Sequence, residues 1–383
     1  MKEAIVGWEV ELRALHTRIA PCFHRAEPRQ RARRYVQALL SPVERKHGWQ
    51  IAERVGEDTP DGIQRLLNAA AWDAEAVRDQ LRSYVIEQLG DPGGVLILDE
   101  TGFVKKGTKS VGVQRQYSGT AGRIENGQIG VFLCYASPAG AAFLDRALYL
   151  PKEWATDVAR RAEAGVPADL TFATKPALAR TMLARALEAG VPAAWVTGDT
   201  VYGNDRRLRV WLEERRQPVV LAIKATEPLW QDGPHYVPAE AIAAALPAEQ
   251  WHRLSAGAGT QGPRRYDWAW REVWRLQLTP EERRWGHWLL VRRSIEDPTD
   301  LAYDIVFAPR AGTRLPALVT VAGTRWASET GFEAAKGECG LDEYEVRTWA
   351  AWHRHLTLVL LAHAFLVVVR AQEAQKGAAM LAS

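Results

Sequence analysis

The apolar positions of residues 1–90 repeat with the period of α-helices. In RQRARRYVQALLS the apolar side chains from Ala32 to Leu40 fall on one helical face. The stretch Ser41-Pro42-Val43-Glu44 has the spacing of a capping box with proline at the first helical position, which predicts that a new helix starts there. Two further helices are predicted over residues 63–70 and 73–89. We therefore expect a helical N-terminal domain.

From residue 93 the pattern changes to short apolar runs bounded by glycine or charged turns, which is typical of strands. The predicted order is strands at 95–98, 111–116, 130–136 and 142–150, a helix at 176–188, a strand at 194–197, a helix at 205–216 and a strand at 219–223. Successive strands followed by alternating helices and strands predict an α/β fold, with helices packed on a mixed sheet.

Residues 225–310 break that alternation. They hold seven of the sixteen tryptophans, and RRYDWAWREVWRLQL and GHWLLVRRSIED alternate apolar and polar residues as antiparallel strands do. Helices are predicted again over 325–336 and 343–374. The expected domains are a helical domain (1–90), the first part of an α/β core (91–224), a β-rich insertion (225–310) and the C-terminal helices of the core (311–383).

The composition narrows the class of protein. Hydrophobic residues make up 47% and charged residues 25%, an ordinary globular balance, and the net charge of +3 does not by itself single out nucleic acid as a partner. Three distant cysteines without a CxxC spacing argue against a disulfide framework, so we expect a reducing, cytoplasmic setting. The first residues lack the apolar stretch of a signal peptide. The longest apolar run, 356–369, contains His363 and is shorter than the roughly 20 residues that span a bilayer, so it is expected to be a core helix.

Two aspartates stand at the predicted carboxyl ends of strands. Asp99 follows VLIL, and Asp199 follows WVTG. A single Asp at a strand end is often a turn former or a helix cap. Two of them at equivalent ends of one open sheet lie where such sheets bind ligands, and their mutual repulsion is relieved by a hard divalent cation, Mg²⁺ or Mn²⁺. The sequence therefore predicts a metal site at this edge.

A third carboxylate for such a site can come from TRWASETGFEAAKGECGLDEYEVR. Glu329 and Glu333 are four residues apart and share one helical face, whereas Glu338 follows the expected helix stop at Gly337. The residues alone leave the choice between the three open.

Basic residues cluster at two places that could contact DNA. Lys105, Lys106 and Lys109 follow the first acidic strand end, where they could bind a polyanion; their loop is not a phosphate-binding P-loop, because Gly107 is followed by Thr108 and then by a strand. The second cluster forms either a solvated helix surface or a face that contacts DNA phosphates, and it consists of Arg29, Arg31, Arg33 and Arg34.

Five segments carry a resemblance to a known family. They are LDETGFVKKG, VGVQRQYSGTAGRIENGQIGVFL, LYLPKEW, WVTGDTVYG and KGECGLDEYEVRTWAAWHRHL. These segments resemble those of IS701-family insertion-sequence transposases, within the IS4-like group of DDE transposases, and the likeness runs along nearly the whole chain. It implies an RNase H-like catalytic core.

The resemblance also implies a catalytic triad of Asp99, Asp199 and Glu329, which would bind the metal ions. Glu329 is placed by the group's signature of Tyr, Arg, Glu and Lys. Arg325, Glu329 and Lys336 match the last three of these, whereas the tyrosine position falls on Ala322.

The implied reaction is cleavage and joining of DNA at insertion-sequence ends. Two metal ions would activate the attacking oxygen and stabilise the leaving one, while Arg325 and Lys336 stabilise the charged transition state. Trp326 would stack on an unpaired base, or else pack in the core. The implied partners are double-stranded DNA, as terminal inverted repeats and target, and a second copy of the chain in a homodimeric synaptic complex.

Two other functions stay open at the level of the sequence. One is a domesticated, transposase-derived regulator that binds DNA without cutting it. The other is a DDE-type endonuclease that cuts without strand transfer. An assay of cleavage and joining with Mg²⁺ separates the three.

Overall fold

The computed structural model describes residues 2–119, 122–260 and 262–382, and the chain divides into two compact units. The first unit comprises Met1–Asp91, Glu100–Thr174 and Ser328–Ser383, and the second comprises Pro92–Asp99 and Lys175–Ala327. Residues 120 and 121, within one of the family segments above, lie outside the described residues. Each unit is described on its own below.

The N-terminal part of the first unit is helical, as predicted. Its helices are α1 (Lys2–Ile19), a 3₁₀ turn (Ala20–Cys22), α2 (Ala26–Leu39), α3 (Gly48–Arg54), α4 (Asp61–Asn68) and α5 (Ala74–Leu89). The helix predicted to start at Ser41 is wrong. Ser41 Oγ instead donates to the Ala38 carbonyl at the end of α2, and helix resumes only at Gly48. Asp73 caps α5 by accepting from the backbone N–H groups of Glu75 and Ala76.

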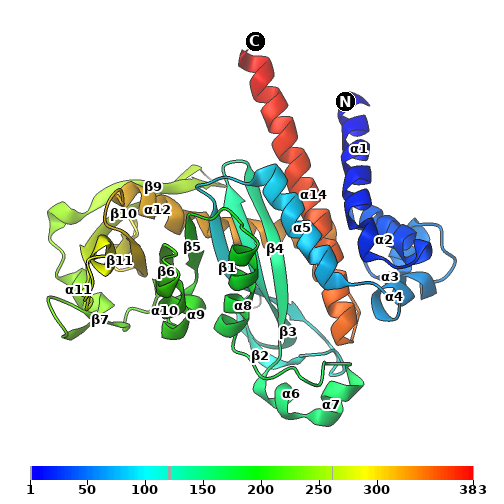
Figure 1. The fold of residues 1–383 in the computed structure, drawn as a ribbon, viewed down its shortest axis with the longest axis horizontal. Coiled ribbons are helices and arrows are strands. Elements are labelled where there is room, and N and C mark those ends of the chain that lie inside the picture. Colours follow the sequence, from blue (N-terminus) through cyan, green and yellow to red (C-terminus); the bar gives the residue numbers. More distant parts are fainter. Residues whose placement is uncertain (1, 120–121, 261, 383) are drawn as a thin grey trace. The chain divides into compact units, whose positions relative to one another are not determined.

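The remainder of the first unit places a long helix against antiparallel strands (Figure 1). Strand β1 (Val95–Val104) has its second half in this unit, next to β3. The others are β2 (Gln114–Ser118), β3 (Arg123–Ser137) and β4 (Gly140–Tyr149), followed by α6 (Lys152–Thr156), α7 (Val158–Glu163), most of α13 (Trp326–Cys339) and α14 (Trp349–Ala382). Both β2 and β4 pair antiparallel with β3.

The apolar run 356–369 lies in α14, which packs on β4 and α5. Among the described residues α14 is the one helix long and apolar enough to cross a membrane by length and composition. Its residues from Leu356 to Ala364 are buried within the protein. The expectation of a core helix is confirmed.

Among the described residues, the second unit contributes seven strands of a larger mixed sheet, together with helices. The order of these strands is β1, β5, β6, β12, β11, β10, β9; β5 pairs parallel with β1 and with β6, and the pairs from β6 onward are antiparallel. The strands are β5 (Trp195–Gly198), β6 (Val219–Ile223), β9 (His252–Gly259), β10 (Gly262–Glu272), β11 (Trp285–Arg293) and β12 (Leu301–Pro309), with a small separate pair, β7 (Pro228–Trp230) and β8 (Tyr236–Pro238). The alternating tryptophan-rich segments are therefore strands, as predicted.

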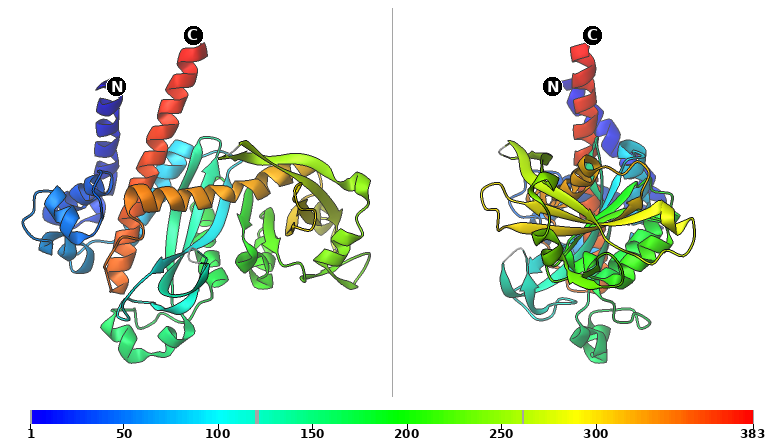
Figure 2. Two further views of the ribbon diagram at one scale, coloured as in Figure 1. Left: turned by 180° about the vertical axis from the view of Figure 1, so that it is seen from behind. Right: turned by 90° about the vertical axis from the view of Figure 1, so that its left-hand side faces the viewer.

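The second unit also contains helices, of which α9 and α12 pack against this sheet. The helices are α8 (Lys175–Glu188), α9 (Thr200–Gly203), α10 (Arg206–Glu214), α11 (Ala239–Ala244) and α12 (Leu315–Thr324), with 3₁₀ turns at Ala248–Gln250 and Glu282–Arg284. Helix α12 packs on β9, β5 and β6, and it is seen beside the strands of the β-rich segment in Figure 2. Its Leu318 and Val319 are buried. The predicted α/β class, a mixed sheet flanked by helices, is confirmed.

Candidate active site

The two predicted aspartates lie at the same level on neighbouring strands of the second unit. Leu98 of β1 is in register with Gly198, the last residue of β5. The acid is the next residue in both places, Asp99 within β1 and Asp199 directly after β5. Adjacent strands are about 4.8 Å apart, so the backbone positions that precede the two acids are direct neighbours. The strand prediction was wrong in one respect, because β1 does not end at Leu98 but continues through Asp99 to Val104.

Asp199 also caps a helix. Its backbone is extended (φ −77°, ψ −173°), and its Oδ1 accepts from the backbone N–H of Val201 at 2.8 Å, at the start of α9. The capping role that strand-end aspartates often have is therefore real here, and it engages one oxygen of the carboxylate.

The candidates for the third carboxylate lie on α13. The helix does not stop at Gly337 as predicted, but continues to Cys339 and ends at Gly340, whose φ of +68° suits glycine. Glu338 is therefore helical, nine residues and about 180° of rotation from Glu329. Glu329 is partly exposed, whereas Glu333 and Glu338 are exposed. A glycine suits position 331 in this helix, because a Cβ there would lie only 3.3 Å from the Phe143 ring.

Three carboxylates form a set of oxygen donors that suits a hard cation, but the residues that carry them belong to different units. Asp99 and Asp199 are in the second unit and Glu329 is in the first. Among the described residues no three His, Cys, Asp or Glu side chains converge on a point where a metal ion could bind. Carboxylate oxygens nonetheless fit Mg²⁺ or Mn²⁺, and the two aspartates supply two of the ligands that such an ion takes from protein.

The end of α12 carries two further predicted residues. Arg325 is the C-cap of α12 and is partly exposed. Arg264 from β10 fixes this end, because its Nη2 donates to the carbonyls of Ala256 (2.7 Å) and Gly323 (2.9 Å). The Arg264 guanidinium also lies 5.3 Å from the ring centre of Trp326. Trp326 is 38% exposed, so core packing does not account for all of its surface.

Lys336, the last member of the signature, lies on α13 in the first unit. Burial lowers its pKa, while Asp342 acts in the opposite direction. A partly buried lysine can release its proton more readily than a solvated one.

Asp304 is a charged residue in this region that the sequence analysis missed. It lies on β12 opposite Ala222 of β6, with one neighbour on either side buried and apolar. Burial raises its pKa to about 6, although Arg325 and Arg292 both attract the carboxylate. The only signal in the sequence is one acid inside the apolar strand LAYDIVFAP, and that signal does not identify the residues around it.

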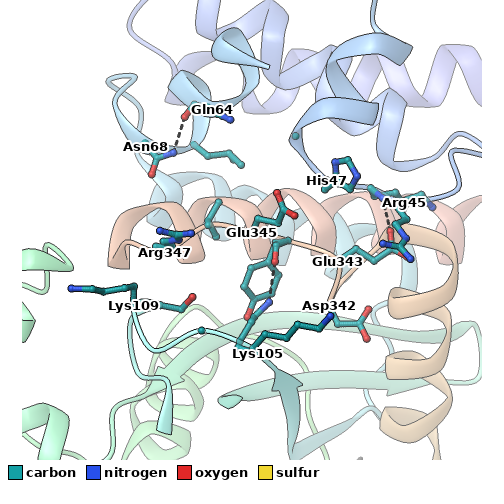
Figure 3. Close-up of a pocket in the computed structure, with 18 of the residues that line it drawn as sticks. Arg45, His47, Gln64, Asn68, Lys105, Lys109, Asp342, Glu343, Glu345 and Arg347 are labelled. Atoms are coloured by element: carbon teal, nitrogen blue, oxygen red, sulfur yellow. Dashed lines mark hydrogen bonds between the residues drawn. The ribbon is translucent and has the colours of Figure 1, made fainter. Parts of the chain in front are cut away.

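The three predicted lysines border a groove in the first unit, with a volume of about 950 Å³ (Figure 3). Gln64 and Asn68 of α4 line one side and Lys109 the other, with Arg347 between them. Arg45, His47 and Lys106 also line it, and the acids on its wall are Asp342, Glu343 and Glu345. Sequence reasoning missed the wall formed by Arg45, His47 and Arg347, because these residues are far from the lysines along the chain.

The three lysines differ in their surroundings. Lys105 Nζ donates to the Tyr344 carbonyl at 2.9 Å and lies 3.5 Å from the centre of its ring. Burial lowers the pKa of Lys105 to about 8, against the opposing attraction of Asp342 and Glu345. Lys106 is exposed, and Lys109 is exposed and pairs with Glu163 at 2.8 Å. Lys106 is thus open to an external anion, Lys109 is exposed but paired, and Lys105 belongs mainly to the wall.

The predicted arginines of α2 also differ. Arg31 pairs with Glu27 and Glu57, and Arg29 is partly buried beside the Phe23 carbonyl. Arg33 and Arg34 are exposed. Of the four, these last two are best placed to meet a phosphate backbone.

Comparison with known proteins identifies the family of this chain. The family described as DDE superfamily endonuclease matches residues 18–260, and the family described as Transposase DDE domain matches residues 162–365. A probable transposase for insertion sequence element IS701, from Microchaete diplosiphon, is 30% identical over 188 residues. That match covers 49% of this chain and 46% of the relative, so the chain spans about half the length of this curated relative.

A solved structure of the piggyBac transposase synaptic complex with hairpin DNA aligns with a TM-score of 0.44 and 11% identity. It covers 98% of this chain and 67% of the other. Two DDE families each match more than half of the chain, and the IS701 resemblance holds over the segment that the curated relative covers. The chain therefore belongs to the DDE transposases, with its similarity on the IS701 side of that family.

Proposed function

We propose that this protein cleaves and joins DNA at insertion-sequence ends by metal-dependent phosphoryl transfer. The observation that supports the proposal is that Asp99 of β1 and Asp199, which directly follows β5, each come one residue after the in-register pair Leu98 and Gly198, in a chain that belongs to the DDE transposases. Glu329 is proposed as the third ligand. The substrate is double-stranded DNA with terminal inverted repeats, joined to target DNA in the cytoplasm by a homodimer that holds two ends.

The residues of the chain have separate roles in this reaction. Asp99, Asp199 and Glu329 would hold Mg²⁺ or Mn²⁺, which when bound supplies Lewis-acid activation of the attacking oxygen and stabilisation of the leaving oxygen. Arg325 and Lys336 would offset the negative charge that develops on the phosphate. Trp326, next to Arg325 and partly exposed, would stack on a base.

DNA binding would use surfaces distinct from the carboxylates. The lysine side of the groove (Lys106 and Lys109, with Lys105 in its wall) and the exposed Arg33 and Arg34 of α2 would contact phosphates. Arg29 and Arg31 would support that face rather than bind directly, because they are already engaged with neighbouring groups. Such contacts position a duplex but do not read its sequence.

The test is an assay of labelled insertion-sequence ends with the full chain, Mg²⁺ and target DNA. We expect cleaved and joined products from the wild type, and neither from Asp99→Asn or Asp199→Asn, with DNA affinity nearly unchanged. Cleavage without joining would indicate the endonuclease instead. Specific binding without cleavage would indicate the regulator. Retained cleavage by Asp99→Asn would overturn the metal-site assignment.

A further inference from the structure

We propose that one face of the β2–β3 hairpin in the first unit contacts the groove of a DNA duplex. The inference rests on the proposed function, because it adds a contact surface for the same DNA. This face, named the ribbon face, consists of four side chains that project to one side of the hairpin: Arg115, Tyr117, Ile124 and Asn126.

The pairing of β2 with β3 determines which side chains share that face. Tyr117 is directly opposite Ile124, and Arg115 is directly opposite Asn126. Directly paired residues of antiparallel strands project to the same side, and residues two apart along one strand do so as well. The four side chains therefore form two adjacent pairs on one side of the hairpin, with Tyr117 and Ile124 nearer the turn.

The hairpin extends beyond the strands that support its base. Strand β4 pairs with β3 from Ile129 onward, whereas β2 pairs with residues 123–127 of β3. The end of β1 lies beside Asn126, because the backbone N–H of Lys105 donates to the Asn126 carbonyl at 2.8 Å. Tyr117 and Ile124 are further toward the turn, so among the described residues they belong to a ribbon of two strands.

The two side chains nearest the turn are apolar and exposed. Tyr117 is 63% exposed and Ile124 is 60% exposed. A ribbon of two strands is marginally stable by itself in water, and an exposed apolar pair adds little to its stability. The pair gains free energy when another surface covers it.

The opposite face of the hairpin is already engaged within the chain. Arg123 pairs with Glu125 at 2.6 Å between Nε and Oε1. Gln114 donates from Nε2 to Oε2 of Glu153, in α6, at 3.1 Å. The ribbon face is therefore the side that can meet a partner.

The charges at the ribbon face favour DNA as that partner. Arg115 is exposed, and none of the four members of the face is an acid. Asn126 Nδ2 donates to the carbonyls of Lys105 (2.6 Å) and Gly107 (2.9 Å), which holds the exposed Lys106 on the same side of the hairpin. An apolar pair flanked by an arginine and a lysine suits a polyanion whose grooves also present apolar groups.

The shape of the hairpin also fits this partner. The major groove of B-DNA is about 12 Å wide and admits a two-stranded β-ribbon. Tyr117 and Ile124 contact apolar groups on the base edges, such as thymine methyl groups, and Arg115 contacts a phosphate. Loss of an apolar contact lowers affinity without a change in salt dependence, whereas loss of a phosphate contact changes that dependence.

The experiment measures binding of a labelled duplex carrying the insertion-sequence end by the full chain, without Mg²⁺, over a range of salt concentrations. The apolar variants are Tyr117→Thr and Ile124→Thr, because threonine keeps the preference for a strand while it removes apolar surface. We expect each to lower affinity about tenfold with an unchanged salt slope. Arg115→Gln should reduce the slope of log affinity against log salt by about 0.9.

Two matched controls separate the ribbon face from exposed residues in general. Arg123→Gln removes an arginine of the opposite face and should keep the wild-type salt slope. Leu278→Thr removes an apolar side chain of the second unit that is 71% exposed, and it should keep the wild-type affinity. All five variants should keep the wild-type melting temperature, because the altered side chains are exposed.

Wild-type DNA affinity in both threonine variants would overturn the inference. Equal salt slopes for Arg115→Gln and Arg123→Gln would also overturn it, whatever the stability of the threonine variants. Loss of self-association in the threonine variants, with DNA affinity retained, would assign the ribbon face to a second copy of the chain instead. A wild type that binds the end but does not cleave it with Mg²⁺ would contradict the proposed function and leave this inference standing.

Discussion

At the scale of single residues, Asp199 combines a helix cap and a proposed metal ligand in one carboxylate. Oδ1 accepts from the Val201 N–H at the start of α9, and the charge of the same carboxylate is what a hard cation would require. Asparagine and alanine at this position separate the two roles, because asparagine is a good N-cap without a charge.

We predict that Asp199→Asn and Asp199→Ala both lose cleavage, but differ in stability. Asp199→Asn should unfold with nearly the wild-type free energy, whereas Asp199→Ala should be less stable by about 1 kcal/mol because the cap is lost. Chemical denaturation beside the cleavage assay measures both. Equal stability of the two variants would show that the cap contributes nothing.

Lys105 and Lys106 are neighbours in sequence with different surroundings. Lys105 contacts the Tyr344 carbonyl and ring, and Lys106 is exposed on the groove. We predict that Lys106→Gln reduces the slope of log affinity against log salt by about 0.9, the value for one lost phosphate contact, without a change in melting temperature. Lys105→Gln should lower the melting temperature instead, because the Tyr344 carbonyl loses its buried donor. The reverse pattern would place the DNA contact at Lys105.

At the scale of elements, α13 determines which glutamate can serve as the third ligand. Glu329 and Glu333 lie within about 40° of each other around the helix, and Glu338 lies on the opposite side. The family signature selects Glu329, and the partial burial of Glu329 distinguishes it from the two exposed acids.

We predict that Glu329→Gln lowers cleavage by orders of magnitude with little change in melting temperature, because a hard cation requires the charge. Glu333→Gln and Glu338→Gln should keep most of the activity, as exposed groups on the same helix. If Glu333→Gln were the inactive variant and Glu329→Gln the active one, the third ligand would have to be reassigned.

Helix α5 and strand β4 are joined by ion pairs in the first unit. Arg146 of β4, 1% exposed in its side chain, donates from Nη2 to Glu75 Oε1 at 2.8 Å. Burial opposes ionisation of Glu75, but attraction by Arg146 and Arg78 outweighs it and lowers the Glu75 pKa to about 2. The pair therefore contributes stability that is fully present above pH 4.5 and is lost as the pH falls toward 2.

We predict that the wild type loses thermal stability between pH 4.5 and 2 more steeply than Glu75→Gln. Melting curves at neutral pH and near pH 3 measure the difference. Glu163→Gln is the control, since its pair with Lys109 is exposed on both sides and surface pairs contribute little. Parallel pH curves for wild type and Glu75→Gln would show that this pair does not link α5 to β4 energetically.

The elements also show how far the sequence could predict the fold. The alternation of apolar and polar residues correctly predicted β10 and β11, and the short apolar runs correctly predicted β5 and β6. These patterns are readable because the apolar side chains of each strand face a core directly. The capping box at Ser41 predicted a helix that does not form. Lys46 donates to the Glu338 carbonyl and to the Glu343 carboxylate, nearly 300 residues away, and these contacts hold this stretch out of a helix. Local rules cannot report such distant partners.

The same limit applies to the candidate site. Asp99 and Asp199 were visible because an acid after an apolar strand stands out in a sequence. Asp304 was missed because one acid inside an apolar strand does not reveal the two arginines from other elements that attract its carboxylate.

At the scale of the whole molecule, the proposed metal ligands are divided between the two units. Asp99 and Asp199 belong to the second and Glu329 to the first, while α13 itself begins in the second unit at Trp326. We propose that Asp99 and Asp199, both of the second unit, bind a metal ion when DNA is present.

A crystal of the full chain with an insertion-sequence end and Mn²⁺ tests this claim most directly, because anomalous scattering locates the ion independently of activity. We predict a Mn²⁺ peak about 2.1 Å from carboxylate oxygens of Asp99 and Asp199, with Glu329 completing the protein ligands. Mn²⁺ bound elsewhere in that complex, with none between Asp99 and Asp199, would contradict it.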